Sequence, residues 1–324
     1  MLATRLMTIG DSVPIKMVTK PDLRRKLGLS NGCGPAGYFF VAPSILFLLI
    51  FVILPVISAL YYSLNRYDLM TPLEFIGAQN YVDLLSDTRY PRAVINTLYF
   101  AIVTVPTGTA LSLLLAMLIN RHIWGIYTFR ALFYMPVVSS FVSVALIWLW
   151  LYEPQFGLFN DILEQIGLPR LKWLRSANTS MLSIIIMSVW KNMGLNMVIF
   201  LAGLQGLPPH LYEAAQIDGA GRVSAFFRIT LPLLSPTTFF VVIMFSIHAL
   251  QIFVQVFIMT ASGGELDNLG GPLDSTISVV VLIYQNAFWF LKMGYASAMS
   301  FVLFMVIGVI TIINARLLQY DVSY

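Results

Sequence analysis

The sequence predicts an all-α, polytopic protein that crosses a membrane about six times. Of its 324 residues, 58% are hydrophobic and only 10% are charged, whereas soluble domains average about 25% charged residues. The apolar residues form continuous runs, each close to the ~20 residues that a helix needs to cross a bilayer. Backbone polar groups in lipid must be hydrogen-bonded within the segment, so each run is expected to be a helix.

Six predicted spans follow a polar N-terminal segment. Residues 1–37 are too long and too charged for a secretory signal peptide and predict a cytoplasmic tail. The membrane domain is expected over residues 38–318, and residues 319–324 form a short C-terminal tail. The predicted spans are Tyr38–Ser63, Val94–Ile119, Ala131–Tyr152, Ser180–Leu204, Thr237–Thr260 and Met293–Leu318.

The distribution of Lys and Arg predicts that the N-terminus is cytoplasmic. These residues are more numerous in the segments that this orientation places inside, as the positive-inside rule requires. A shorter apolar run, Thr276–Phe290, contains Tyr284, Gln285 and Asn286. At this length an interfacial or re-entrant segment is expected; a seventh span would instead place the C-terminus outside.

The chain lacks the sequence motifs of an enzyme. It has no phosphate-binding G-x-x-x-x-G-K-[ST] loop and no H-E-x-x-H pair, so we expect no catalysis, no metal and no cofactor in this chain. The small net charge of +4 is scattered and does not indicate nucleic-acid binding. All fifteen acidic residues lie outside the six runs, which disfavours proton coupling but leaves a sodium-coupled secondary transporter open.

A polar loop between the fourth and fifth runs, residues 205–232, predicts a short helix followed by a tight bend. Pro209 suits the first turn of a helix, Glu213 lies in an early turn where an anion is favoured, and Asp218-Gly219 is a turn signal. Small residues keep this segment slim: Ala214, Ala215 and Ala220. From these features alone, an ordinary amphipathic surface loop is an equally good interpretation.

The loop resembles the EAA motif of bacterial ABC importer permeases. The matching residues are Glu213-Ala-Ala, Asp218-Gly219-Ala220, Ile229 and Leu231-Pro232. The resemblance runs from about Tyr38 to Leu318 and is closest to maltose-type carbohydrate importers; residues 270–298 are similar to the MalF-like member of a two-permease pair. It implies the ABC type I importer permease fold and a permease for a sugar or related polyol, with glycerol phosphate or another small solute as alternatives.

The resemblance also implies partners in a bacterial cytoplasmic (inner) membrane. They are a second permease subunit, expected to be a different chain, two ATP-binding subunits that bind ATP and Mg, and an extracytoplasmic solute-binding protein. The residues implied to couple this chain to the ATPase are Glu213, Ala214, Ala215, Asp218, Gly219 and Ala220. Glu213 would be a polar anchor and Gly219 a bend that a larger residue would not tolerate. A structural subunit without a transport path is the further alternative.

Polar residues within two predicted spans form the candidate substrate site. Placing a lysine such as Lys191 at the centre of a membrane helix costs about 2.5–3.5 kcal/mol. Ser188 and Asn192 lie within about one turn of Lys191. His248, Gln251 and Gln255 recur at helical spacing. Polar contacts between helices, at about 0.6 kcal/mol each, are the alternative. Because these two helices line the sugar site in the maltose-type family, the resemblance implies that substrate contacts Ser188, Lys191, Asn192, His248 and Gln251. The residue types differ from the maltose pattern, so the same sugar is not implied.

Overall fold

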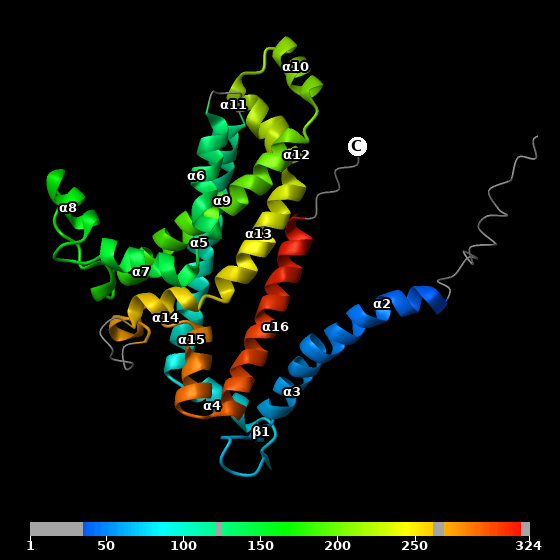
Figure 1. The fold of residues 1–324 in the computed structure, drawn as a ribbon, viewed down its shortest axis with the longest axis vertical. Coiled ribbons are helices and arrows are strands. Elements are labelled where there is room, and N and C mark those ends of the chain that lie inside the picture. Colours follow the sequence, from blue (N-terminus) through cyan, green and yellow to red (C-terminus); the bar gives the residue numbers. More distant parts are fainter. Residues whose placement is uncertain (1–34, 121–124, 262–268, 319–324) are drawn as a thin grey trace, which may run out of the picture. The chain divides into compact units, whose positions relative to one another are not determined.

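The computed structural model describes residues 35–120, 125–261 and 269–318. Almost all of the regular structure there is helical (Figure 1). Its one strand pair is short: β1 (Asn65–Arg66) and β2 (Glu74–Phe75) are antiparallel. The chain divides into two units, Met1–Ser58 and Ala59–Tyr324, which are described in turn.

The first unit contains one apolar helical segment. It consists of α2 (Pro35–Leu48), a π-helical stretch η1 (Leu49–Ile53) and the start of α3 (Leu54–Ser63), which continues into the second unit. Residues 38–57 are exposed, and almost all of them are apolar, as expected for a helix surrounded by lipid. Tyr38–Ser63 is long and apolar enough to cross a membrane, which confirms the first predicted span.

Three long helices of the second unit also match predicted spans. They are α5 (Arg89–Ile119), α9 (Ser180–Gln205) and α16 (Met293–Leu318), and each can cross a membrane by length and composition. α5 begins at Arg89 rather than at the predicted Val94. α5 packs along α9, and α13 (Ser235–Leu250) packs on α5 and α16 (Figure 1).

The prediction that the third span, Ala131–Tyr152, is one continuous helix is wrong. The structure has α6 (Ile126–Val138) and α7 (Phe141–Leu151), which meet at an angle of 100°. Pro136 lacks a backbone N–H and crowds the preceding turn, and Ser139 and Ser140 are extended. The break therefore lies just after a proline, within an uninterrupted apolar run.

The fifth predicted span, Thr237–Thr260, is also broken. α13 ends at Leu250, residues 251–253 are not helical, and α14 (Val254–Thr260) follows. A second bend, of 67°, separates α13 from the preceding segment 222–233, which contains α11 (Arg222–Ala225), η3 (Phe226–Thr230) and α12 (Leu231–Leu233). The described residues thus hold four helices that can cross a membrane, or up to six if each bent pair is one span, in agreement with the predicted six.

Short elements connect these helices. They are α4 (Gln79–Ser86), α8 (Leu158–Gln165), η2 (Trp173–Arg175), α10 (Pro209–Ile217), η5 (Pro272–Asp274), α15 (Val279–Tyr284) and η6 (Gln285–Trp289). The last two form one apolar helix, Val279–Trp289, which is shorter than a membrane span. The expectation that this segment is interfacial or re-entrant stays a prediction.

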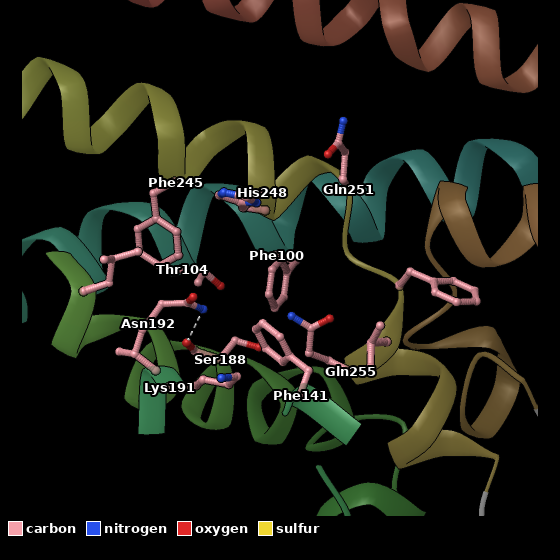
Figure 2. A pocket seen from close by; sticks show the side chains of 15 residues that line it. Phe100, Thr104, Phe141, Ser188, Lys191, Asn192, Phe245, His248, Gln251 and Gln255 are labelled. Carbon is pink, nitrogen blue, oxygen red and sulfur yellow. Dashed lines mark hydrogen bonds between the residues drawn. The ribbon is translucent and has the colours of Figure 1, made fainter. Parts of the chain in front are cut away.

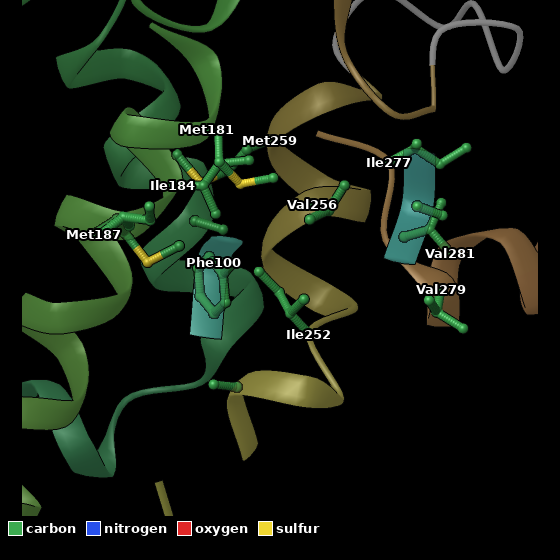
Figure 3. Close-up of a cluster of buried hydrophobic side chains, with 14 of the residues drawn as sticks. Phe100, Met181, Ile184, Met187, Ile252, Val256, Met259, Ile277, Val279 and Val281 are labelled. Carbon is green, nitrogen blue, oxygen red and sulfur yellow. The ribbon is translucent and has the colours of Figure 1, made fainter. Parts of the chain in front are cut away.

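Two apolar clusters hold the second unit together. The first joins α5, α9, α14 and the segment around α15; among its members are Phe100, Ile184, Val256 and Ile277 (Figure 3). The second lies nearer to α10 and includes Ala116, Phe200, Leu234 and Val241. The first cluster holds α14 in place, and the second holds the start of the 205–232 loop.

Candidate functional site

A cavity of about 380 Å³ lies where the broken helices meet α5 and α9 (Figure 2). It is lined by Phe100, Thr104, Val137, Phe141, Ser188, Lys191, Asn192, Leu195, Phe245, His248, Ala249, Gln251, Phe253, Val254 and Gln255. All five predicted substrate residues line this one cavity, although they come from two segments far apart in sequence, α9 and residues 248–251.

Lys191 connects α9 to the break between α6 and α7. Its Nζ donates hydrogen bonds to the carbonyl oxygens of Pro136, at 2.8 Å, and Ser139, at 2.9 Å. It also lies 4.3 Å from the centre of the Phe141 ring. The last carbonyls of a helix have no partner within the helix and attract cations. Lys191, which is 4% exposed, therefore stabilises the end of α6 as well as lining the cavity.

Two hydroxyl groups beside the cavity have no partner within the described part of the chain. Asn192 Nδ2 donates to the carbonyl oxygen of Ser188 at 2.8 Å, but the buried Oγ of Ser188 has no hydrogen-bond partner among the described residues. The same holds for Oγ1 of Thr104 on α5. An unpaired buried hydroxyl is costly, and a polar ligand in the cavity would relieve that cost.

Thr104 was not predicted from the sequence. Thr97 and Thr107, on the same helix, donate their hydroxyls to the carbonyl oxygens of Ala93 and Val103, a common way for Thr to be satisfied within a helix. Nothing in the sequence separates Thr104 from these two residues. Only the packing of α5 against α9 and α13 reveals its position at the cavity.

The predicted common helix face of His248, Gln251 and Gln255 is not formed, because α13 ends at Leu250. His248 lies in the last turn of α13, Gln251 follows the helix end, and Gln255 belongs to α14. All three still line the cavity. Figure 2 shows the Gln255 amide directed towards Phe100, whereas the exposed Gln251 amide points away from Asn192.

The cavity offers hydrogen bonds and aromatic ring faces. Amide, hydroxyl, imidazole and ammonium groups lie among four phenylalanine rings, and no Asp or Glu is found among the described lining residues. Within the described residues, no three His, Cys, Asp or Glu side chains are placed to hold a metal ion. Amide, hydroxyl and ammonium groups among aromatic rings suit the binding of a polar organic solute.

The 205–232 loop has the predicted short helix and bend. α10 has Pro209 in its first turn, and Gly219 adopts a φ of 76°. The N–H of Ala220 donates to Ala215 O at 2.8 Å and that of Gly219 to Gln216 O at 3.1 Å, which is the Schellman pattern of helix termination. The prediction of a helix and a turn at Asp218-Gly219 is confirmed.

The outer side of this loop is open to a partner. Glu213, Ala214, Asp218 and Gly219 are exposed, and Ala215 and Ala220 are half-buried. Large apolar side chains lie exposed on the same segment: Ile217 (87%), Val223 (72%) and Phe227 (60%). On the inner side, the hydroxyls of Tyr212 and Thr230 lie 3.0 Å apart and join α10 to η3.

Asn160 organises the loop after α7. Its Nδ2 donates to the carbonyl oxygens of Pro154 and Leu171, and its Oδ1 accepts from Leu171 N and Trp173 Nε1. The residue is fully buried. Nearby, Arg170 donates to the Glu164 carboxylate, and this hydrogen bond raises the pKa of the Arg170 guanidinium above its usual value. The segment is therefore an ordered structure on the surface.

Comparisons with known proteins agree with the fold. Residues 87–323 match the family described as "Binding-protein-dependent transport system inner membrane component". The probable ABC transporter permease protein YesP of Bacillus subtilis is 36% identical over 292 residues, which cover 89% of this chain and 92% of YesP. The sulfoquinovosyl glycerol transport system permease protein SmoG of Agrobacterium fabrum is 33% identical, over 86% of this chain and 89% of SmoG.

A solved structure is also similar. It is a chain of a bacterial alginate ABC transporter in complex with an alginate pentasaccharide-bound periplasmic protein. The two chains superpose with a TM-score of 0.75 and 25% sequence identity, over 92% of this chain and 96% of the other. With the family match and the membrane-spanning helices, this shows a multi-pass membrane protein with the type I importer permease fold. The chain belongs to the family of binding-protein-dependent transport system inner membrane components and is an ABC transporter permease.

Proposed function

We propose that this chain is the permease subunit of an ATP-driven importer that carries a carbohydrate into a bacterial cell. The observation that carries the proposal is the cavity at the helix breaks, where Ser188, Lys191, Asn192 and His248 converge. Interrupted helices that surround a polar cavity at membrane depth are a recurrent device of membrane transport proteins.

The chemistry of the cavity suits a sugar. Amide and hydroxyl groups can hydrogen-bond to sugar hydroxyls, and the rings of Phe100, Phe141, Phe245 and Phe253 offer apolar surfaces to its C–H groups. Binding sites combine apolar walls with a few placed polar groups in this way. The names of SmoG and of the alginate transporter refer to sulfoquinovosyl glycerol and alginate, which supports a carbohydrate for this chain.

Energy would come from a separate ATP-binding subunit. The exposed face of α10, with Glu213 as a polar anchor and Gly219 at the bend, would dock into that subunit. The segment 222–233 joins α10 to α13, which lines the cavity through His248. Closure of two ATP-binding subunits on ATP and Mg could therefore move a cavity wall through connected helices.

Family membership supports the remaining assembly. A second permease subunit would complete the transmembrane part, and an extracytoplasmic solute-binding protein would deliver the sugar. The loops of residues 64–88 and 152–179 connect membrane helices and would face that protein if the N-terminus is cytoplasmic. The similar alginate transporter was solved with a periplasmic protein, which supports such a partner.

The test is purification of the tagged chain from its host in mild detergent, followed by reconstitution of whatever co-purifies. We expect an ATP-binding subunit and a second permease, and saccharide uptake that needs ATP and the solute-binding protein. Collapse of ion gradients by an ionophore should leave uptake unchanged. Recovery of the chain without an ATPase, or uptake that the ionophore abolishes, would favour a secondary transporter instead.

A further inference from the structure

We propose that the transported saccharide carries an oxyanion group, a carboxylate, sulfonate or phosphate, which binds between Lys191 and the start of α7. This inference rests on the proposed carbohydrate import and goes further by assigning the charge of the substrate. Three features of the cavity carry it: its formal charge, the free end of a helix and two unpaired hydroxyl groups.

Among the described residues that line the cavity, Lys191 carries a formal positive charge and none is Asp or Glu. The lysine is 4% exposed, and its partners in the described chain are two carbonyl oxygens and one ring face. Carbonyl dipoles neutralise only part of a buried unit charge. An ammonium has three donors, and two are used, so an anion can accept the third and balance the charge.

The start of α7 adds to this positive region. Phe141, its first residue, lines the cavity, and the preceding Ser140 makes no side-chain capping hydrogen bond. The first N–H groups of a helix lack partners within it and favour anions. Lys191 donates to Ser139 O, directly before this helix start. The ammonium and the helix end therefore lie side by side.

The two unpaired hydroxyl groups are the third feature. Ser188 Oγ is buried within a residue that is 1% exposed, and Thr104 Oγ1 within one that is fully buried; neither has a partner among the described residues. Figure 2 shows Ser188 next to Lys191 and Asn192 on α9, and all three residues line the cavity. As donors without acceptors, the two hydroxyl groups suit the several acceptor oxygens of an oxyanion.

The charge of the cavity can be measured without knowing the saccharide. The assembled transporter would carry Gln255→Cys in a Cys33→Ser background, since Cys33 is the single cysteine of this chain. Two thiol reagents would be compared, the anionic sulfonatoethyl and the cationic trimethylammonioethyl methanethiosulfonate, with labelling read by mass on the peptide that contains position 255. A matched transporter would carry Met70→Cys instead, at an exposed loop position.

The decisive comparison adds Lys191→Gln, which removes the charge and keeps a side chain that can donate two hydrogen bonds. We expect this change to lower the ratio of anionic to cationic labelling at position 255 about tenfold, because a nearby unit charge acts on the two reagents in opposite directions. The ratio at position 70 should not change. An unchanged ratio at position 255 would overturn the proposal.

A second experiment uses matched saccharides. Oligosaccharides that contain uronic acids would be compared with the same compounds after reduction of their carboxyl groups to alcohols. We expect the acidic members to drive uptake in the reconstituted system and the reduced members to fail, with Lys191→Gln weakening uptake of the acidic ones at least tenfold. Efficient uptake of the neutral members alone would overturn the acidic assignment and leave carbohydrate import intact. Failure of every saccharide would instead count against the proposed function.

Discussion

The ammonium of Lys191 lies 2.8 Å from the carbonyl oxygen of Pro136, so α9 is hydrogen-bonded to the end of α6 at the point where that helix breaks. A lysine within an apolar run thus has a structural partner and a place in the cavity wall. These two roles can be separated by substitution. The structural role depends on hydrogen bonding to the end of α6, whereas the role in the cavity depends on the positive charge.

Lys191→Met should destabilise the transporter, because it leaves the carbonyls of Pro136 and Ser139 without their donor. The expected cost is about 1–3 kcal/mol, typical of a buried polar group that loses its partner. Lys191→Gln should recover part of it, since its amide can donate. The stability of both variants can be measured by thermal denaturation of the detergent-solubilised complex, monitored by fluorescence-detection size-exclusion chromatography. Equal stability of the methionine variant and the native protein would contradict a structural role for the hydrogen bonds.

Sequence reasoning predicted the α10 segment well because its signals are local. Pro209 presets the first turn of a helix, and Gly219 takes the left-handed conformation that ends it. The long spans were also predictable, because hydropathy over some twenty residues is what a membrane selects. In both cases the cause of the structure lies within the segment itself.

The helix breaks were not predicted, because their hydropathy is continuous. Pro136 can bend a helix mildly or break it, and the outcome depends on whether a neighbour satisfies the freed carbonyls. Here Lys191 does so from another helix, more than fifty residues away in sequence. Likewise, Thr104 reaches the cavity only through packing between helices, so no local pattern could identify it.

Gly194 permits the close approach of α9 to α6. A Cβ at this position would overlap the carbonyl oxygen of Phe133, a backbone atom that cannot move without shifting α6. We expect Gly194→Ala to destabilise the complex by about 1–3 kcal/mol, as overpacking does in dense cores. The matched control is Gly308→Ala on α16, where a Cβ would have no neighbour within 4 Å among the described residues. If the two alanine variants melted at the same temperature, close packing of α9 on α6 would not be limiting.

Gly219 is predicted to matter for its backbone conformation. Its φ of 76° costs an ordinary L-residue about 1–2 kcal/mol, and a β-branched side chain more, whereas asparagine tolerates this region. A Cβ there would meet nothing within 4 Å in the described part of the chain. Gly219→Val should therefore abolish stimulation of the ATPase by the loaded solute-binding protein, and Gly219→Asn should retain most of it.

Both Gly219 variants must be shown to insert and assemble equally, by recovery of the ATP-binding subunit with the tagged chain. If the valine and asparagine variants lost stimulation equally, the backbone conformation would not be the cause. The size of the side chain at residue 219, which would then collide with a groove of the partner, would explain the loss instead.

Asn160 is expected to be the residue on which the loop after α7 depends most. It makes four hydrogen bonds in a fully buried position, so Asn160→Ala leaves the N–H of Leu171, the indole N–H of Trp173 and the carbonyl of Leu171 without the partner that Asn160 provides, while the carbonyl of Pro154 keeps a bond from Arg170. Each buried group left unpaired costs about 1–3 kcal/mol, which is enough to unfold a local segment. The loop should then become open to protease from the outside while the membrane helices remain assembled.

Limited proteolysis of sealed vesicles, with the cut sites mapped by mass, measures this directly. Asn178→Ala is the matched control, because Asn178 is exposed and its side chain carries none of the hydrogen bonds that hold this loop. If the solute-binding protein docks on this loop, Asn160→Ala should also weaken its binding, and Asn178→Ala should do so much less. Protease resistance equal to that of the native protein would show that the aromatic cluster of Trp148, Tyr152, Phe159 and Trp173 holds the loop without Asn160.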